Sequence, residues 1–238
     1  MDKTDEQTNK TSLRKTGIIS GFAYLMIFVF SITANFFVFE KLIVSRDPVS
    51  TISNIIANES LFRFGIACWV IVVIFDVIVA WGFYLLLKPI NKSLSLLAAY
   101  FRVVFSAIFG YSFVNYFAVL KLLNPNTFDS NYLNAQVALL LNTQYFAVRI
   151  SYVFFGIHIF LLGLLILKSK HIPRILGIFL VIASCGYLID SFGNFLSSAY
   201  ANNGSVFMIF VGFPALISEF SLTVWLLLKG GKEINKKI

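Results

Sequence analysis

Five ionisable side chains lie well away from the ends of long apolar stretches of this sequence, where they would meet hydrocarbon rather than water. They are Asp76, Arg102, His158, Asp190 and Glu219. In such a place a carboxylate or an imidazole can bind a cation or pass on a proton, and an arginine can neutralise a carboxylate. Because hydrocarbon offers no hydrogen bonds, all five must face protein or a wet cavity. We take them as a candidate intramembrane site, together with Asn194, one helical turn after Asp190.

The spacing of these side chains from basic residues indicates their depth. Asp76, His158 and Glu219 each precede a lysine at the end of an apolar stretch by 10 to 12 residues. With a helical rise of about 1.5 Å per residue, they should lie about 15 to 18 Å from the cytoplasmic end of each helix. These three side chains are therefore expected to share the bilayer midplane. Asp190, at about 24 Å by the same measure, should lie closer to the outer surface.

The elements that must position these side chains are six apolar stretches. A helix that spans a bilayer needs about 20 predominantly apolar residues. The stretches are Gly17 to Phe39, Leu61 to Leu87, Leu94 to Leu123, Tyr145 to Leu167, Ile175 to Ser197 and Val206 to Leu228. The composition agrees, because 58% of the 238 residues are hydrophobic and the mean hydropathy is +0.84. The sequence therefore predicts an all-α integral membrane protein with six transmembrane helices.

The lysines and arginines indicate how these helices are oriented. If the six stretches cross the membrane in turn, 13 of the 19 basic residues fall on the side of the N-terminus. Basic residues concentrate on the cytoplasmic side, so both termini are predicted to be cytoplasmic. We expect a cytoplasmic tail at residues 1–15, a six-helix domain at 16–229 and a second cytoplasmic tail at 230–238. Since the net charge of +8 lies in short clusters between apolar runs, the expected partner is a lipid bilayer and not nucleic acid.

Two short amphipathic helices are predicted on the outer side of the membrane. Asp47 followed by Pro48 is a favourable helix start, because the aspartate can cap the helix and proline suits its first position. Apolar residues then recur at helical spacing from Ile52 to Ile56. A second such pattern, from Leu133 to Leu141, is expected to run into the fourth spanning stretch.

Several segments of the chain match a known pattern in their order and combination. They are NIIANESLFR at 54–63, LLKPINKSLSLLAAYFRV at 86–103, FFGIHIFL at 154–161, PRILGIFLVIASCGYLIDSF at 173–192 and SEFSLTVWLLLKG at 218–230. Together they resemble the bacterial membrane family catalogued as domain of unknown function 4386 (DUF4386). The resemblance implies a six-helix, multi-pass protein of the bacterial cytoplasmic (inner) membrane. It implies no activity, so it assigns no catalytic or binding residue.

The first functional hypothesis is a small transporter coupled to protons or cations. In this hypothesis Asp76, His158 and Glu219 line a polar cavity at the midplane that binds a small solute or ion, and Asp190 guards its outer entrance. No motif identifies a substrate. We expect no cofactor, because a haem held by two histidines would need both within the bilayer and only His158 lies there.

Two alternatives stay open. A metal-dependent intramembrane hydrolase would hold zinc with His158 and two acids and use another carboxylate as general base. The chain has no HExxH motif, and His171 lies in a cytoplasmic turn, so we favour a protein that is not an enzyme and expect no metal. In the third hypothesis the protein is a structural or partner subunit whose intramembrane acids pair with Arg102. Arg63 and Arg149 are then expected near the outer interface, where long side chains can snorkel.

Overall fold

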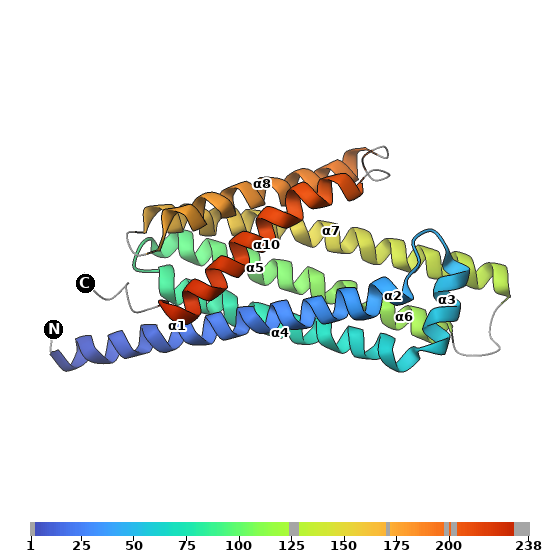
Figure 1. The fold of residues 1–238 in the computed structure, drawn as a ribbon, viewed down its shortest axis with the longest axis horizontal. Helices are drawn as coiled ribbons and strands as arrows, with labels where there is room; N and C mark the ends of the chain where they lie inside the picture. The colour runs from blue at the N-terminus through green and yellow to red at the C-terminus, as the bar shows by residue number, and fades with distance from the viewer. Residues whose placement is uncertain (1–2, 124–128, 170–171, 198–199, 201–203, 231–238) are drawn as a thin grey trace.

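Long helices make up nearly all of the described chain, and the computed structural model arranges them side by side along one axis (Figure 1). The structure describes residues 3–123, 129–169, 172–197, 200 and 204–230, without the side chains of 3–12 and 204–213. No strand occurs within these ranges, which confirms the all-α class. His171 and the predicted tail beyond Gly230 lie outside the described residues.

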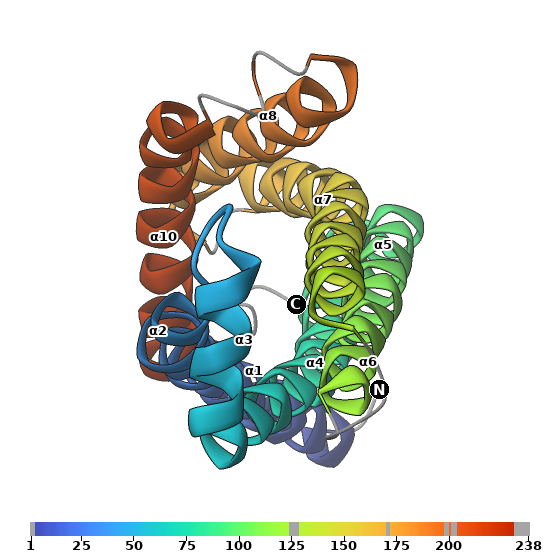
Figure 2. The same cartoon turned by 90° about the vertical axis from the view of Figure 1, so that its right-hand side faces the viewer.

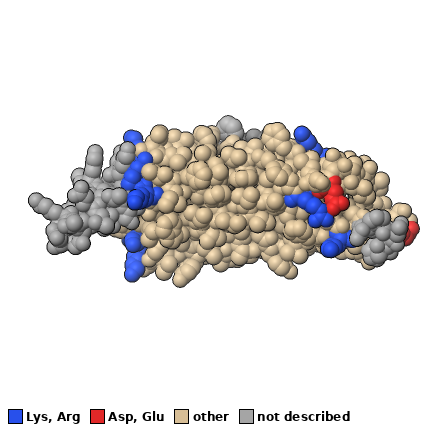
Figure 3. All heavy atoms as spheres, turned by 90° about the horizontal axis from the view of Figure 1, so that it is seen from below, with Lys and Arg blue, Asp and Glu red and all other residues tan. Residues whose placement is uncertain are grey.

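Five helical segments of the described chain are long and apolar enough to cross a membrane, so the protein is a polytopic membrane protein. They match the first five predicted stretches and cover residues 13–42, 59–87, 92–122, 130–168 and 174–196. At the sixth predicted stretch lies the helix α10 (Gly204–Leu228), which is apolar over residues 214–228. On the face seen in Figure 3, charged side chains gather toward the two ends and leave an uncharged band between them.

The first and third segments differ in detail from the predicted helices. The first consists of α1 (Lys3–Ile32), the π-helical turn η1 (Thr33–Phe39) and α2 (Glu40–Leu42), so its helix begins well before Gly17. The third consists of α5 (Lys92–Ser112) and α6 (Val114–Leu122). The break falls at Phe113, next to Ser112, whose hydroxyl donates to the Phe109 carbonyl at 2.6 Å.

The two short helices predicted between the spans are present. In α3 (Pro48–Ala57), the Asp47 carboxylate caps the N-terminus by accepting from the Ser50 amide at 3.0 Å, and proline occupies the first position. Ile52 and Ile55 are buried while Ile56 is exposed, so α3 lies with its apolar side on the bundle. The second outer helix continues without interruption into the fourth span as α7 (Ser130–Lys168).

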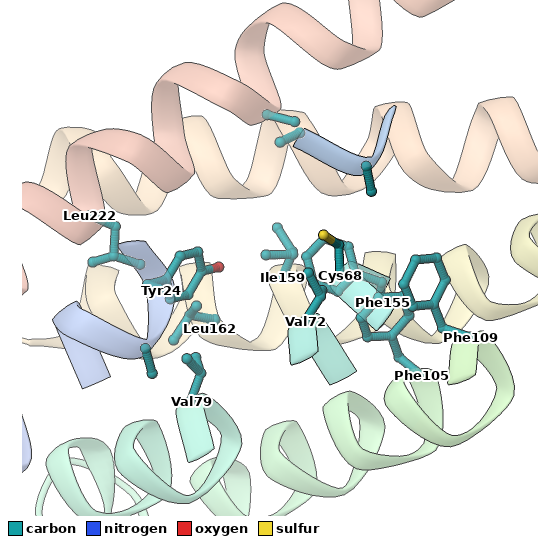
Figure 4. Close-up of a cluster of buried hydrophobic side chains, with 14 of the residues drawn as sticks. Tyr24, Cys68, Val72, Val79, Phe105, Phe109, Phe155, Ile159, Leu162 and Leu222 are labelled. Atoms are coloured by element: carbon teal, nitrogen blue, oxygen red, sulfur yellow. The ribbon is translucent and has the colours of Figure 1, made fainter. Parts of the chain in front are cut away.

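The long helices form a closed ring (Figure 2). With α4 (Glu59–Leu87) and α8 (Arg174–Leu196), the order of neighbours is α1, α4, α5, α7, α8, α10 and back to α1. Side chains from several of these helices meet in the interior, where Tyr24 of α1 lies between Leu222 of α10 and Leu162 of α7 (Figure 4).

At one end of the bundle, α1 and α10 are held together closely. The Arg14 guanidinium donates to the carbonyls of Leu227 and Gly230, each at 2.8 Å. A Cβ atom on Gly17 would lie only 2.6 Å from the Gly230 backbone, so only glycine permits this approach. From this crossing α10 runs away from α1 and reaches α8 at its opposite end (Figures 1 and 2).

Candidate functional site

The centre of the polar network is an ion pair between α4 and α5. The Arg102 Nε atom donates to Asp76 Oδ1 at 3.0 Å, and Nη2 donates to the same oxygen. Asp76 is 2% exposed and Arg102 is 1% exposed, so the pair has no access to solvent or lipid. The short connection between α4 and α5 makes them antiparallel neighbours, which places the two side chains at one level.

His158 of α7 joins this pair through both ring nitrogens. Its Nδ1 lies 2.8 Å from the Ala98 carbonyl oxygen, which can only accept, and its Nε2 lies 3.2 Å from Arg102 Nη1, which can only donate. Hydrogen therefore sits on Nδ1, and the Nε2 lone pair accepts from the guanidinium. In this arrangement neither nitrogen is available to a metal ion or to a proton relay.

Two tyrosines that sequence reasoning missed connect Arg102 to Glu219. The Tyr24 hydroxyl accepts from Arg102 Nη1 and donates to Glu219 Oε2, each at 3.3 Å, and the Tyr187 hydroxyl donates to Glu219 Oε1 at 3.2 Å. The Arg102 guanidinium also lies over the Tyr24 ring, 4.9 Å from its centroid. The structure thus brings four of the predicted residues together at one level: Asp76, Arg102, His158 and Glu219. Glu219 is connected to Arg102 through the Tyr24 hydroxyl group and not by direct contact.

Asp190 and Asn194 belong to a second cluster, near the C-terminal end of α8. The Asn194 amide donates to the Asp190 carbonyl at 2.7 Å and to its carboxylate at 3.3 Å, so the two residues share a face of α8. Arg149 of α7 forms an ion pair with Asp190, and Tyr145 donates its hydroxyl to Asn194 Oδ1 at 2.9 Å. Arg149 does not extend to the interface as expected, because α7 packs along α8 and the Asp190 carboxylate lies within its reach.

Arg63 keeps to the surface. It pairs with Glu59 one helical turn earlier in α4, with Nε 2.7 Å from Oε1, and both side chains are 55% exposed. This exposed pair belongs to neither cluster.

A cavity of about 460 Å³ lies between the two clusters and is lined by residues of both. Glu219 and Tyr187 of the first cluster and Arg149 and Tyr145 of the second all belong to its wall. Half of the 20 lining residues are aromatic, among them Phe28, Trp69, Phe109, Tyr116, Tyr152 and Tyr187. The cavity therefore combines an aromatic wall with one carboxylate and one guanidinium.

The charges around this cavity are unequal. Arg149 is balanced by Asp190, and Arg102 is balanced by direct contact with Asp76. Glu219 receives hydrogen bonds from two hydroxyl groups, and in the described part of the chain it makes no ion pair with a lysine or arginine. Glu219 is therefore the acid in the cavity wall that lacks a positive partner of its own.

A metal centre finds no support in the described residues. Within them, no three His, Cys, Asp or Glu side chains come close enough together to hold a metal ion. His158, the residue on which the hydrolase hypothesis depends, already uses both nitrogens.

The chain is similar to one protein family and to one protein sequence from another organism. The model of the family described as "Domain of unknown function (DUF4386)" matches residues 19–230. An uncharacterised protein of Archaeoglobus fulgidus is 35% identical over 162 residues, which cover 68% of this chain and 81% of that protein. No solved structure matches the chain. The match to the family agrees with the segments on which the sequence resemblance rests.

Proposed function

Since the chain belongs to the DUF4386 family, whose description names no activity, we propose from the cavity itself that the protein is a small transporter coupled to protons or cations. Glu219 is the group that exchanges the coupling ion, and the cavity receives the transported solute. This proposal includes Asp76, Arg102 and His158 as the frame that positions Glu219.

The observation that carries the proposal is that the Glu219 carboxylate lies in the wall of a cavity and has no basic partner among the described residues. An isolated charge near the bilayer centre costs at least about 2.5 to 3.5 kcal/mol. Asp76, Arg102 and Glu219 carry two negative charges and one positive charge when all are ionised. A proton or a cation at Glu219 removes the excess negative charge. Because the cavity reaches Glu219, the bound proton or cation can be exchanged.

The outer cluster completes the proposed site. Asp190, Asn194 and Arg149 connect α7 to α8 at the outer part of the cavity. The pair can open when a passing solute or water replaces the partner of each charge, because an uncompensated buried charge is costly. We assign it the role of an outer gate.

The topology that the proposal requires is six spans with both termini in the cytoplasm, in a cytoplasmic membrane. The length of α10, 25 residues, suits a sixth span. Arg14 and Gly230 meet at one end of the bundle, which agrees with both termini lying on one side. Single cysteines at position 53 in α3 and position 10 near the N-terminus, in a variant lacking Cys68 and Cys185, should react with impermeant reagents from outside and inside the cell respectively.

A second candidate function rests on a different observation. Asp76, Arg102 and His158 are almost completely buried, and Arg102 is hydrogen-bonded to both of the others. This arrangement also suits a structural or partner subunit, in which the network serves only to fix helix packing.

Proton flux into proteoliposomes separates the two candidates. Purified protein is reconstituted with a pH-sensitive dye inside, and a potassium diffusion potential, negative inside, draws protons inward. The wild type should acidify the lumen faster than empty liposomes, and Glu219→Gln should not. Glu59→Gln, which removes an exposed carboxylate of α4, is the matched control and should behave as the wild type. A wild-type flux no greater than that of empty liposomes would favour the structural subunit, and equal, raised fluxes for the wild type and Glu219→Gln would show that Glu219 is not the coupling group.

A further inference from the structure

We propose that the cavity binds a lipophilic organic cation, whose positive charge takes the place of the proton or ion at Glu219. This inference rests on the proposed function, because it names the substrate class of the same site. It is drawn from three features of the cavity: its aromatic wall, its charges and its opening toward lipid.

The aromatic wall favours a cation over a neutral solute. The faces of aromatic rings attract positive charge, and cages of such rings are a recurring way to bind quaternary ammonium groups. Tyr152, Tyr187 and Phe109 lie in the wall, with the rings of Tyr152 and Tyr187 5.5 Å apart. A volume of about 460 Å³ falls within the range of sites for small organic ligands.

The charges of the cavity exclude a simple anion site. Arg149 lies in the wall, but its guanidinium is paired with Asp190 and stacked on the Tyr145 ring at 4.7 Å. Its buried Nε–H has no hydrogen-bond partner and can donate to a carbonyl or ether oxygen of a ligand. An anion would have to displace Asp190 and would also meet Glu219. An organic cation meets a carboxylate that has only hydroxyl donors around it.

The cavity also reaches the lipid-facing surface. Ile32, Phe36 and Leu216 line it, and they are 44%, 55% and 50% exposed on the bundle. Ile32 and Phe36 come from the outer part of the first span, and Leu216 comes from α10. These two elements meet at their cytoplasmic ends and separate toward the outer end (Figures 1 and 2). A lipophilic molecule can enter through this side opening, whereas a hydrated inorganic ion cannot.

Binding conserves charge. The Glu219 carboxyl group releases one proton to the aqueous phase as one organic cation enters, so the site keeps the same net charge. The titratable and charged groups around Glu219 come from every helix packed near it. They are Tyr24 on α1, Asp76 on α4, Arg102 on α5, Tyr152 and His158 on α7, and Tyr187 on α8. Asp76 and Arg102 balance each other, and His158 is neutral, so the exchanged proton belongs to Glu219.

The test measures binding of tetraphenylphosphonium to the full-length protein in lipid nanodiscs, with empty nanodiscs as background. We expect saturable binding, at least tenfold weaker in Glu219→Gln and unchanged in Glu59→Gln. Calorimetry in two buffers of different ionisation enthalpy should count about one proton released per cation bound. Tetraphenylborate, an anion of the same shape, should show no saturable binding.

A second variant keeps the test decisive if Glu219→Gln does not fold. Tyr152→Leu removes a ring and keeps an apolar wall, so it should weaken tetraphenylphosphonium binding about three- to tenfold. Three results would each overturn the inference. The first is that folded wild-type protein shows no saturable binding of tetraphenylphosphonium, and the second is that both variants bind it as tightly as the wild type. The third is saturable binding of tetraphenylborate. If tetraphenylphosphonium does not bind while Glu219-dependent proton flux persists, the ligand class is wrong and the transporter proposal stands. If both are absent, the transporter proposal fails as well.

Discussion

Arg102 and Asp76 lie on adjacent antiparallel helices and meet in an ion pair that is 1% and 2% exposed. Two charges in this setting are tolerated because each neutralises the other and because Tyr24 and His158 accept the remaining guanidinium hydrogens at Nη1. Removal of one member leaves the other charge buried without compensation, which is much more costly than the loss of the contact alone.

Asp76→Asn is therefore expected to destabilise the protein by about 3 to 5 kcal/mol. The measurement is the midpoint of denaturation in mixed detergent micelles, compared with Glu59→Gln, which breaks an exposed pair and should change stability by less than about 1 kcal/mol. The double variant Asp76→Asn/Arg102→Gln should recover part of the loss because no bare charge remains. A single variant as stable as the wild type would show that the buried pair is not required for packing.

Substitution of Gly17 is expected to lower stability, because this residue lies where α1 and α10 cross. In Gly17→Ala the new methyl group would meet the Gly230 backbone at 2.6 Å, so the helices must move apart at a cost of about 1 to 3 kcal/mol. Gly110→Ala is the matched control, because there the nearest atom would be a Val73 methyl group at 3.4 Å. Its stability should stay constant or rise by up to about 1 kcal/mol, as alanine favours helix over glycine. Thermal unfolding of both variants, followed by circular dichroism, distinguishes the two sites.

The outer ion pair predicts an effect on ligand binding. In Asp190→Asn the Arg149 charge in the cavity wall loses its partner and repels a cation, so tetraphenylphosphonium affinity should fall about three- to tenfold. Arg149→Gln/Asp190→Asn removes both charges and should restore most of the affinity. Both variants can be measured by the nanodisc assay. A loss that persists in the double variant would mean that Asp190 contacts the ligand itself.

Asp47 predicts a pH effect outside the membrane. The Ser50 hydroxyl, at 2.5 Å, and the Ser50 amide hold the pKa of the Asp47 carboxyl below its usual range. A carboxyl group with a pKa depressed by folding contributes stability above its unfolded pKa of about 4, and this contribution disappears as the pH falls through the lower folded value. Amide hydrogen exchange in α3, corrected for the intrinsic rate, should therefore accelerate in acid below about pH 4. Asp47→Asn should show no such acceleration beyond the background of the remaining chain.

Much of the fold could be predicted from sequence because each feature had a local cause. The apolar stretches gave five spans and the position of α10, and the Asp47–Pro48 pair gave the start of α3. The spacing of Asp190 and Asn194 gave their shared face. The break at Phe113 was missed because no proline marks it and the apolar stretch continues on both sides of it.

The candidate site could be predicted only in part. Depth along a helix follows from counting residues, and Asp76, His158 and Glu219 do meet at one level. The rotation of one helix against another does not follow from counting, so the inward turn of Arg149 was missed. Tyr24 and Tyr187 were missed because aromatic side chains within a span most often pack or anchor. Their hydroxyl groups stand out only once Glu219 is placed between them.

Because α10 diverges from the first span, the ligand concentration that matters for the cavity is the concentration in the lipid and not that in bulk water. In the proposed route, molecules that enter between these helices come from the acyl chains of the surrounding lipid, which act as a reservoir. A compound that partitions strongly into lipid is presented to the cavity at far above its bulk level, and occupancy then follows its oil–water partition coefficient as much as its fit. Within a homologous series of cations, longer alkyl groups should therefore lower the apparent dissociation constant even where they make no added contact with the protein.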